Sequence, residues 1–167
     1  MDQHQKAQAL VERFLSYLAI TSQSDPKVKT IPSTEGQWNM ARVLEAGLRH
    51  FGLENVHVDE HANVTGFLPG TVKGVPSVGF VAHMDTVDVG LSPEIHPQVI
   101  EYKGGDVCLN AEKDIWIRLA DHPELAQYKG QDIIFTDGTS VPPRRCRRSL
   151  WRICSIKSAP ASAKSWP

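Results

Sequence analysis

The sequence predicts an α/β fold in which helices pack against a sheet. Two stretches with apolar residues at helical spacing begin the chain, and two short stretches of alternating apolar and polar residues follow. Residues 76–82 are then nearly all apolar or small, which is typical of a strand buried on both faces. This order of helices, short edge strands and buried strand is that of a sheet covered by helices.

The first helix is expected over residues 6–20. Leu10, Phe14 and Leu18 recur at every fourth position, so their side chains form one apolar stripe along a helix. The next stretch, residues 21–33, is rich in Ser, Thr and Pro and has no apolar periodicity. We therefore expect a loop there.

The second helix is expected to begin at Thr34. Gln37 follows at the spacing of a capping box, in which the two side chains satisfy backbone N–H groups that the first helical turn leaves unpaired. Apolar residues continue at helical spacing up to Phe51. Gly52 then stands where a residue with left-handed backbone conformation commonly ends a helix.

The remaining ordered stretches predict short strands. Val56 and Val58 alternate with polar residues, and residues 63–68 form a second extended stretch that Pro-Gly ends. Further extended pieces are expected at residues 97–102, 106–109 and 131–136, with partly helical structure over residues 115–128.

Length and composition exclude several classes of protein. A chain of 167 residues has room for one ordinary domain, and 41% hydrophobic with 22% charged residues is typical of globular proteins. No apolar run approaches the roughly 20 residues that span a bilayer, and the polar N-terminus does not resemble a signal peptide. The three cysteines show no metal-binding spacing and cannot all pair, which favours a reducing compartment, so we expect a cytoplasmic protein.

The formal net charge of −1 conceals a sharp break. Residues 1–141 carry all 19 acidic and 11 basic groups, a net charge of −8, whereas residues 142–167 carry seven basic groups and no acidic group. The second segment also lacks helical or strand periodicity. A basic tail of this kind can bind nucleic acid or an acidic surface.

The clearest candidate for chemistry is the pair His83 and Asp85. In an extended backbone, residues two apart point to the same side, so these side chains project together. A carboxylate that accepts a hydrogen bond from one imidazole nitrogen fixes the tautomer that leaves the other nitrogen free for a metal. Ligands also bind at the carboxyl ends of strands in open α/β sheets. The spacing alone equally suits a structural hydrogen-bonded pair at a strand end.

Four blocks of the sequence, in this order, resemble the peptidase T family. These enzymes are tripeptide aminopeptidases of the dizinc metallopeptidase group that includes aminoacylase and carboxypeptidase G2-like enzymes. The resemblance covers about residues 6–141 and is carried by Ile-Pro-Ser-Thr-Glu-Gly-Gln-Trp at 31–38, Gly-Phe-Val-Ala-His-Met-Asp-Thr at 79–86, Tyr-Lys-Gly-Gly-Asp at 102–106 and Phe-Thr-Asp-Gly-Thr-Ser at 135–140.

The resemblance implies a role for each member of the pair. His83 would be the first zinc ligand, and Asp85 would be the catalytic-site carboxylate that orients it. In the family, two zinc ions share a water that attacks the peptide carbonyl, and a glutamate moves the proton. The implied fold is the N-terminal part of a zinc-peptidase catalytic domain, with helices on a mixed sheet. Small peptides are the implied substrates, and no substrate-binding residue is predicted.

The sequence departs from the family pattern after residue 141. The family has further carboxylate and histidine ligands and a lid domain beyond this point, whereas residues 142–167 contain no Asp, Glu or His. We therefore expect residues 1–141 to be a partial metallopeptidase catalytic domain, and residues 142–167 to be a disordered, non-homologous tail produced by a shifted reading frame. A chain of this kind would bind zinc weakly and would be inactive, because a catalytic zinc needs three protein ligands.

Two alternatives remain open from the sequence. The arginines of residues 144–148, with Trp151 or Trp166 for base stacking, would suit a nucleic-acid-binding tail. We do not expect this role, because the tail interrupts an enzyme domain in mid-sheet. The other alternative is a fragment that binds a protein partner through the edge of its sheet. Oligomeric state is not predicted.

The remaining histidines and cysteines are expected to have structural or surface positions. No other histidine has partners at metal-ligand spacing, and Cys108 is expected to be a half-buried strand residue. Cys146 and Cys154 have no further Cys or His nearby to complete a metal site.

Overall fold

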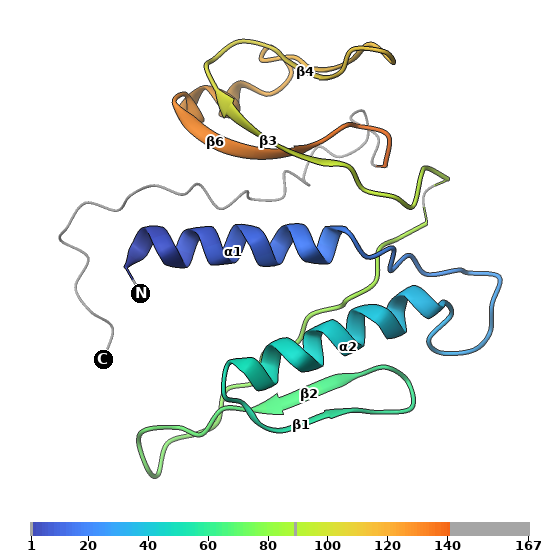
Figure 1. Ribbon diagram of the computed structural model, residues 1–167, viewed down its shortest axis with the longest axis vertical. Helices are drawn as coiled ribbons and strands as arrows, with labels where there is room; N and C mark the ends of the chain where they lie inside the picture. The colour runs from blue at the N-terminus through green and yellow to red at the C-terminus, as the bar shows by residue number, and fades with distance from the viewer. Residues whose placement is uncertain (1, 89, 141–167) are drawn as a thin grey trace. The chain divides into compact units, whose positions relative to one another are not determined.

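Both helices predicted from the apolar spacing are present in the computed structural model, which describes residues 2–88 and 90–140 (Figure 1). The described chain also contains one 3-10 helix and six short strands. These described residues divide into two units, one formed by Ile20–Pro93 and the other by residues 2–19 together with residues 94–140. The predicted tail at residues 142–167 lies outside the described residues.

The ends of helix α2 (Glu35–His50) are those that the sequence predicts. Thr34 is the N-cap residue, and its backbone N–H donates to Gln37 Oε1 at 3.0 Å. At the other end, Gly52 has a φ of +76° and donates its N–H to the carbonyl of Arg49. Leu53 donates to the carbonyl of Leu48, which completes a Schellman motif. Both ends of the helix are therefore closed by local hydrogen bonds.

Strands β1 (Glu54–Val58) and β2 (Val64–Phe67) form an antiparallel pair beside α2 (Figure 1). The carboxylate of Asp59 accepts three hydrogen bonds from the turn between the strands. Gly66 brings the β2 backbone close to the helix, because a Cβ atom at this position would lie 3.4 Å from Leu48 Cδ1. The predicted strands at residues 56–58 and 63–68 are thus confirmed.

The strand predicted at residues 76–82 is wrong. This stretch has no strand pairing among the described residues, and its large apolar side chains face solvent, with Phe80 95% and Val81 100% exposed. A strand needs a neighbouring strand to satisfy its backbone N–H and C=O groups, and the described part of the chain supplies none here. The apolar sequence is that of a buried strand, but no described partner covers it.

Helix α1 (Gln3–Leu18) begins three residues before the predicted start. Asp2 caps it, because the Asp2 carboxylate accepts the N–H of Gln5 at 2.8 Å and the Gln5 side chain accepts the N–H of Asp2 at 2.9 Å. This reciprocal capping box makes a helix start at residue 3 more favourable than one at residue 6.

The chain from Glu94 onward forms two antiparallel strand pairs. Strand β3 (Pro97–Tyr102) pairs over its whole length with β6 (Gln131–Thr136), and both have the predicted bounds. Between them in sequence, β4 (Val107–Asn110) pairs with β5 (Ile115–Ile117). The partly helical structure predicted at residues 115–128 is correct only for the 3-10 helix η1 (Pro123–Tyr128).

The sheet differs from the mixed sheet that the resemblance implies. The described chain forms three separate sheets, each of two antiparallel strands. The parallel contact in this part of the chain is an isolated bridge between Gln23 and Thr86. An α/β composition is therefore confirmed, whereas a continuous mixed sheet is not formed by the described residues.

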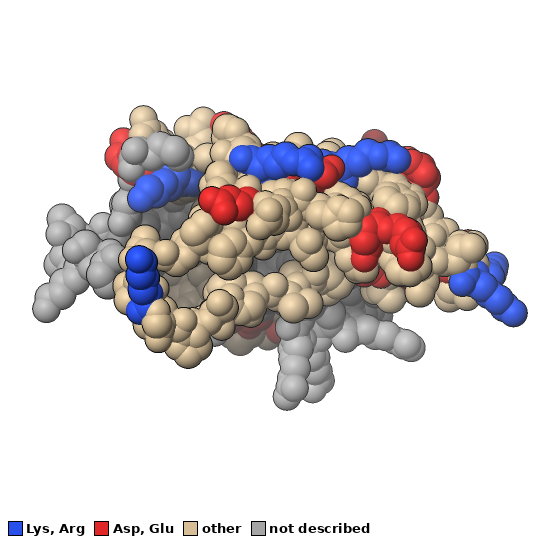
Figure 2. Space-filling view, turned by 90° about the horizontal axis from the view of Figure 1, so that it is seen from below, with Lys and Arg blue, Asp and Glu red and all other residues tan. Residues whose placement is uncertain are grey.

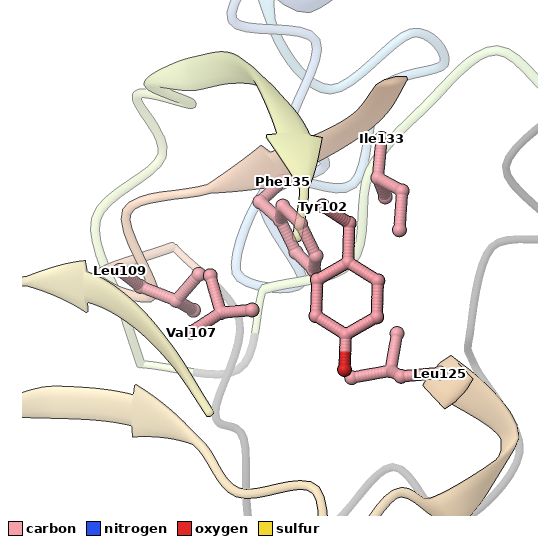
Figure 3. Packing of buried hydrophobic residues seen from close by; sticks show 6 residues of the cluster. All are labelled: Tyr102, Val107, Leu109, Leu125, Ile133 and Phe135. Atoms are coloured by element: carbon pink, nitrogen blue, oxygen red, sulfur yellow. The ribbon is translucent and has the colours of Figure 1, made fainter. Parts of the chain in front are cut away.

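Apolar side chains from β3, β4, β6 and η1 form a buried cluster in which the side chains point toward one another (Figure 3). Tyr102 contributes both to this cluster and to the adjacent glycine turn, because its hydroxyl donates to the carbonyl of Gly105 at 2.8 Å. The side-chain amide of Gln98 donates to the carbonyl of Leu109 at 2.8 Å and so links β3 to β4. The buried members of the cluster are Tyr102, Val107, Leu109, Leu125, Ile133 and Phe135.

Leu125 is expected to be essential to this cluster. Replacing it with Ala removes a fully buried side chain and leaves a cavity, so Leu125→Ala should reduce the free energy of unfolding by about 2–5 kcal/mol. Urea unfolding monitored by tryptophan fluorescence measures this change. Val99→Ala, at an exposed position of β3, is the matched control and should change stability by about 0.5 kcal/mol or less.

Asp106 is expected to make the stability of this unit depend on pH. The Leu119 N–H at 2.8 Å and the Arg118 guanidinium at 2.9 Å lower the pKa of the Asp106 carboxyl below 3.8. A lowered pKa means that the ionised carboxylate stabilises the folded state above pH 3.8, and that this contribution is lost as the pH falls through the folded value. Asp106→Asn should therefore destabilise the chain at neutral pH and converge with the wild type in acid. Urea unfolding at several pH values measures the difference in free energy of unfolding between the two chains. A difference that is the same at every pH would contradict this assignment.

Candidate functional site

The His83–Asp85 pair lies in the unit formed by Ile20–Pro93, directly after the exposed apolar stretch. His83 Nδ1 lies 2.9 Å from the backbone oxygen of Asp85 and 3.2 Å from its Oδ1. The structure thus brings the two predicted side chains together, although the residues before them form no strand.

This geometry determines the tautomer of His83. Neither the Asp85 carbonyl nor its ionised carboxylate can donate a hydrogen bond, so Nδ1 must carry the proton and donate it. The lone pair of Nε2 is then available to a metal ion. The His83 side chain is 80% exposed, so a metal can reach Nε2 without a change of fold.

The geometry of the pair is not by itself specific for a metal site. His122 Nδ1 also lies 3.2 Å from a carboxylate oxygen, that of Glu124, but the His122 side chain is only 27% exposed. The pair therefore differs from His122 and Glu124 by its accessibility, and its zinc-binding role remains a prediction.

The described residues do not make a complete zinc site. Within residues 2–88 and 90–140, no group of three or more His, Cys, Asp or Glu side chains could hold a metal ion. His83 fits one ligand position with its tautomer already fixed, whereas a catalytic zinc takes three protein ligands. The described part of the chain therefore supplies fewer protein ligands than a catalytic zinc needs.

The acidic residues of the blocks at 102–106 and 135–140 accept hydrogen bonds from backbone N–H groups in the unit that contains β3 to β6. Burial raises the pKa of Asp137, but this effect is outweighed. Hydrogen bonds from the N–H and hydroxyl of Thr139, at 2.9 and 2.7 Å, lower the pKa, which lies below its ordinary value. Asp106 accepts the hydrogen bonds of Arg118 and Leu119 described above. Both carboxylates thus stabilise local backbone structure.

Cys108 is a free, half-buried residue of β4, as predicted. Cys146 and Cys154 lie outside the described residues. Neither helix of the described chain combines the length and the apolar character that a membrane crossing requires.

Residues 22–24, within the loop that the sequence predicts, contact the segment that carries the pair. Residues 22–24 pair with residues 84–86 through the bridge between Gln23 and Thr86. Ser22, 1% exposed, donates its hydroxyl to the carbonyl of Met84. Local sequence gives no signal for this contact, because the residues are 62 positions apart.

Comparison with curated proteins confirms the resemblance that the four blocks predict. The chain is 54% identical over 135 residues to a peptidase T-like protein of Yersinia pestis, a match covering 81% of this chain and 33% of that protein. It is 49% identical over 132 residues to a peptidase T-like protein of Rhizobium meliloti, with 79% and 32% covered. It is 47% identical over 136 residues to peptidase T of Geobacillus thermodenitrificans, with 80% and 33% covered. The chain spans about a third of the length of these curated relatives. No protein-family model matches the chain.

Proposed function

The chain belongs to the peptidase T family, and from this membership we propose that it represents part of a zinc-dependent tripeptide aminopeptidase in which His83 is a zinc ligand. Residues 1–141 would be the catalytic-domain portion. Small peptides would be the substrates of the family protein, and the cytoplasm its location. The name peptidase T of the relatives supports this proposal.

The observation that carries the proposal is the contact between His83 and Asp85. The carboxylate and carbonyl of Asp85 accept a hydrogen bond from Nδ1–H and orient the ring, so that Nε2 is free on an exposed side chain. This is the arrangement in which an outer carboxylate orients a histidine ligand. When bound, zinc lowers the pKa of a coordinated water and polarises a carbonyl group.

The 167-residue chain would not hydrolyse peptides by itself. His83 supplies one imidazole, and residues 142–167 contain no Asp, Glu or His that could add a carboxylate or imidazole ligand. Because several ligands together make zinc binding tight, one imidazole with an orienting carboxylate gives weak binding.

The activity of the purified chain tests this directly. With zinc added, we expect the release of N-terminal residues from tripeptides to be no faster than for His83→Ala, measured by separating the released amino acid. Zinc-dependent release well above that of His83→Ala would show that the chain holds a working site.

A zinc titration tests the role of His83. Because its Nε2 is free and exposed, Zn²⁺ should shift the His83 imidazole signals in NMR spectra at lower concentration than those of any other histidine. Asp85→Ala should weaken this binding, since it removes the orienting carboxylate. His122→Ala, which removes the less exposed histidine of similar geometry, should leave it unchanged. Earlier binding at His122 than at His83 would contradict the assignment.

The nucleic-acid alternative rests on the basic segment at residues 142–167. Its arginines lie outside the described residues. The face shown in Figure 2 carries both basic and acidic side chains. Of the described arginines, Arg42, Arg49 and Arg118 each form an ion pair with a carboxylate. Strongly salt-dependent binding of DNA or RNA, abolished when the four arginines of residues 144–148 are replaced by Gln, would favour this alternative.

A further inference from the structure

The hydroxyl of Ser22 contacts the backbone between the two residues of the candidate site. Ser22 is buried, and its Oγ donates to the carbonyl oxygen of Met84 at 2.9 Å. Met84 separates His83 from Asp85 in sequence. The hydrogen bond therefore fixes the carbonyl of the peptide group that joins Met84 to Asp85.

Backbone hydrogen bonds extend this contact on its C-terminal side. Thr86 donates its N–H to the carbonyl of Ser22 at 3.2 Å, and Ser24 donates its N–H to the carbonyl of Thr86 at 3.0 Å. The Ser24 hydroxyl lies 3.3 Å from the same Thr86 oxygen. These bonds fix the backbone at residues 84–86.

The loop that makes these contacts is itself fixed to helix α2. The Thr34 hydroxyl donates to the carbonyl of Gln23 at 2.9 Å. Gly36, in the first turn of α2, lies directly against the loop, since a Cβ atom there would collide with the carbonyl oxygen of Thr21. A rigid helix end therefore supports residues 21–24, and these in turn support the segment that carries the pair.

We propose that Ser22 is a positioning residue for His83. Nδ1 of His83 must meet both the carbonyl and the carboxylate of Asp85, so the backbone from residue 83 to residue 85 needs one defined conformation. The Ser22 hydroxyl maintains that conformation through Met84, without touching the imidazole. The consequence for metal binding rests on the zinc-ligand role proposed for His83, whereas the consequence for the tautomer does not.

The tautomer of His83 in the full 167-residue chain is the direct readout. NMR of the ¹⁵N-labelled imidazoles should show the proton mainly on Nδ1 in the wild type. In Ser22→Ala the Nδ1-protonated fraction should fall, while the signals of His57 and His96 stay unchanged. A general loss of folding would move all three histidines. Ser16→Ala, at an exposed serine of α1, is the matched control.

Zinc affinity is the second readout. The affinity of His83 for added Zn²⁺ should fall about two- to tenfold in Ser22→Ala, the range expected when one hydrogen bond that maintains a conformation is lost. If Zn²⁺ does not bind His83 in any chain but the tautomer still changes, the zinc role fails and the positioning role stands. If Zn²⁺ binds His83 and neither readout changes in Ser22→Ala, Ser22 is not a positioning residue.

A pair of larger substitutions keeps the test decisive if Ser22→Ala does not fold. Thr and Val have the same shape and differ only in the hydroxyl, so any strain in the buried position is common to both. Ser22→Thr should retain the Nδ1 tautomer of His83, and Ser22→Val should lose it. Equal tautomer fractions in these two variants would overturn the proposal.

Discussion

The bridge between residues 22–24 and residues 84–86 is the constraint on which the candidate site depends. The stretch before the site, residues 76–82, has the composition of a buried strand but no strand partner within the described chain. It therefore cannot position His83. The loop after α1 does so instead, because it is fixed to the N-terminus of α2 and hydrogen-bonds the backbone around Thr86. Local polar contacts thus replace the order that a sheet would otherwise provide.

The unit that contains β3 to β6 is organised differently, around an apolar cluster that its own strands and 3-10 helix complete. Two of the sequence blocks shared with the peptidase T family lie in this unit, and their polar residues close turns: Tyr102 bonds Gly105, and Asp137 bonds Thr139. The block around His83 is the one for which we propose a chemical role. A family motif therefore reports structure in one place and a candidate ligand in another, and only the contacts distinguish the two cases.

The sequence predicts those elements that local signals determine. Thr34 and Gly52 mark the start and the end of α2 as predicted, and β3 and β6 have the predicted bounds. These signals succeed because turn and cap residues act within a few positions. Failures occur where distant partners decide, as in the unpaired residues 76–82. The contact of His83 with Asp85 follows from their spacing. The support from Ser22 could not be predicted, because its partner is 62 residues away.

Native-state hydrogen exchange tests most directly whether the loop, and not a paired strand, supports the site. We expect the backbone N–H groups of Ser24 and Thr86, which are hydrogen-bonded across the bridge, to exchange slowly. Those of Phe80 and Val81 should exchange at nearly the rate of an unfolded chain. Slow exchange at all four amides would show that residues 76–82 are paired. Rapid exchange at Ser24 and Thr86 would show that the bridge does not support the site.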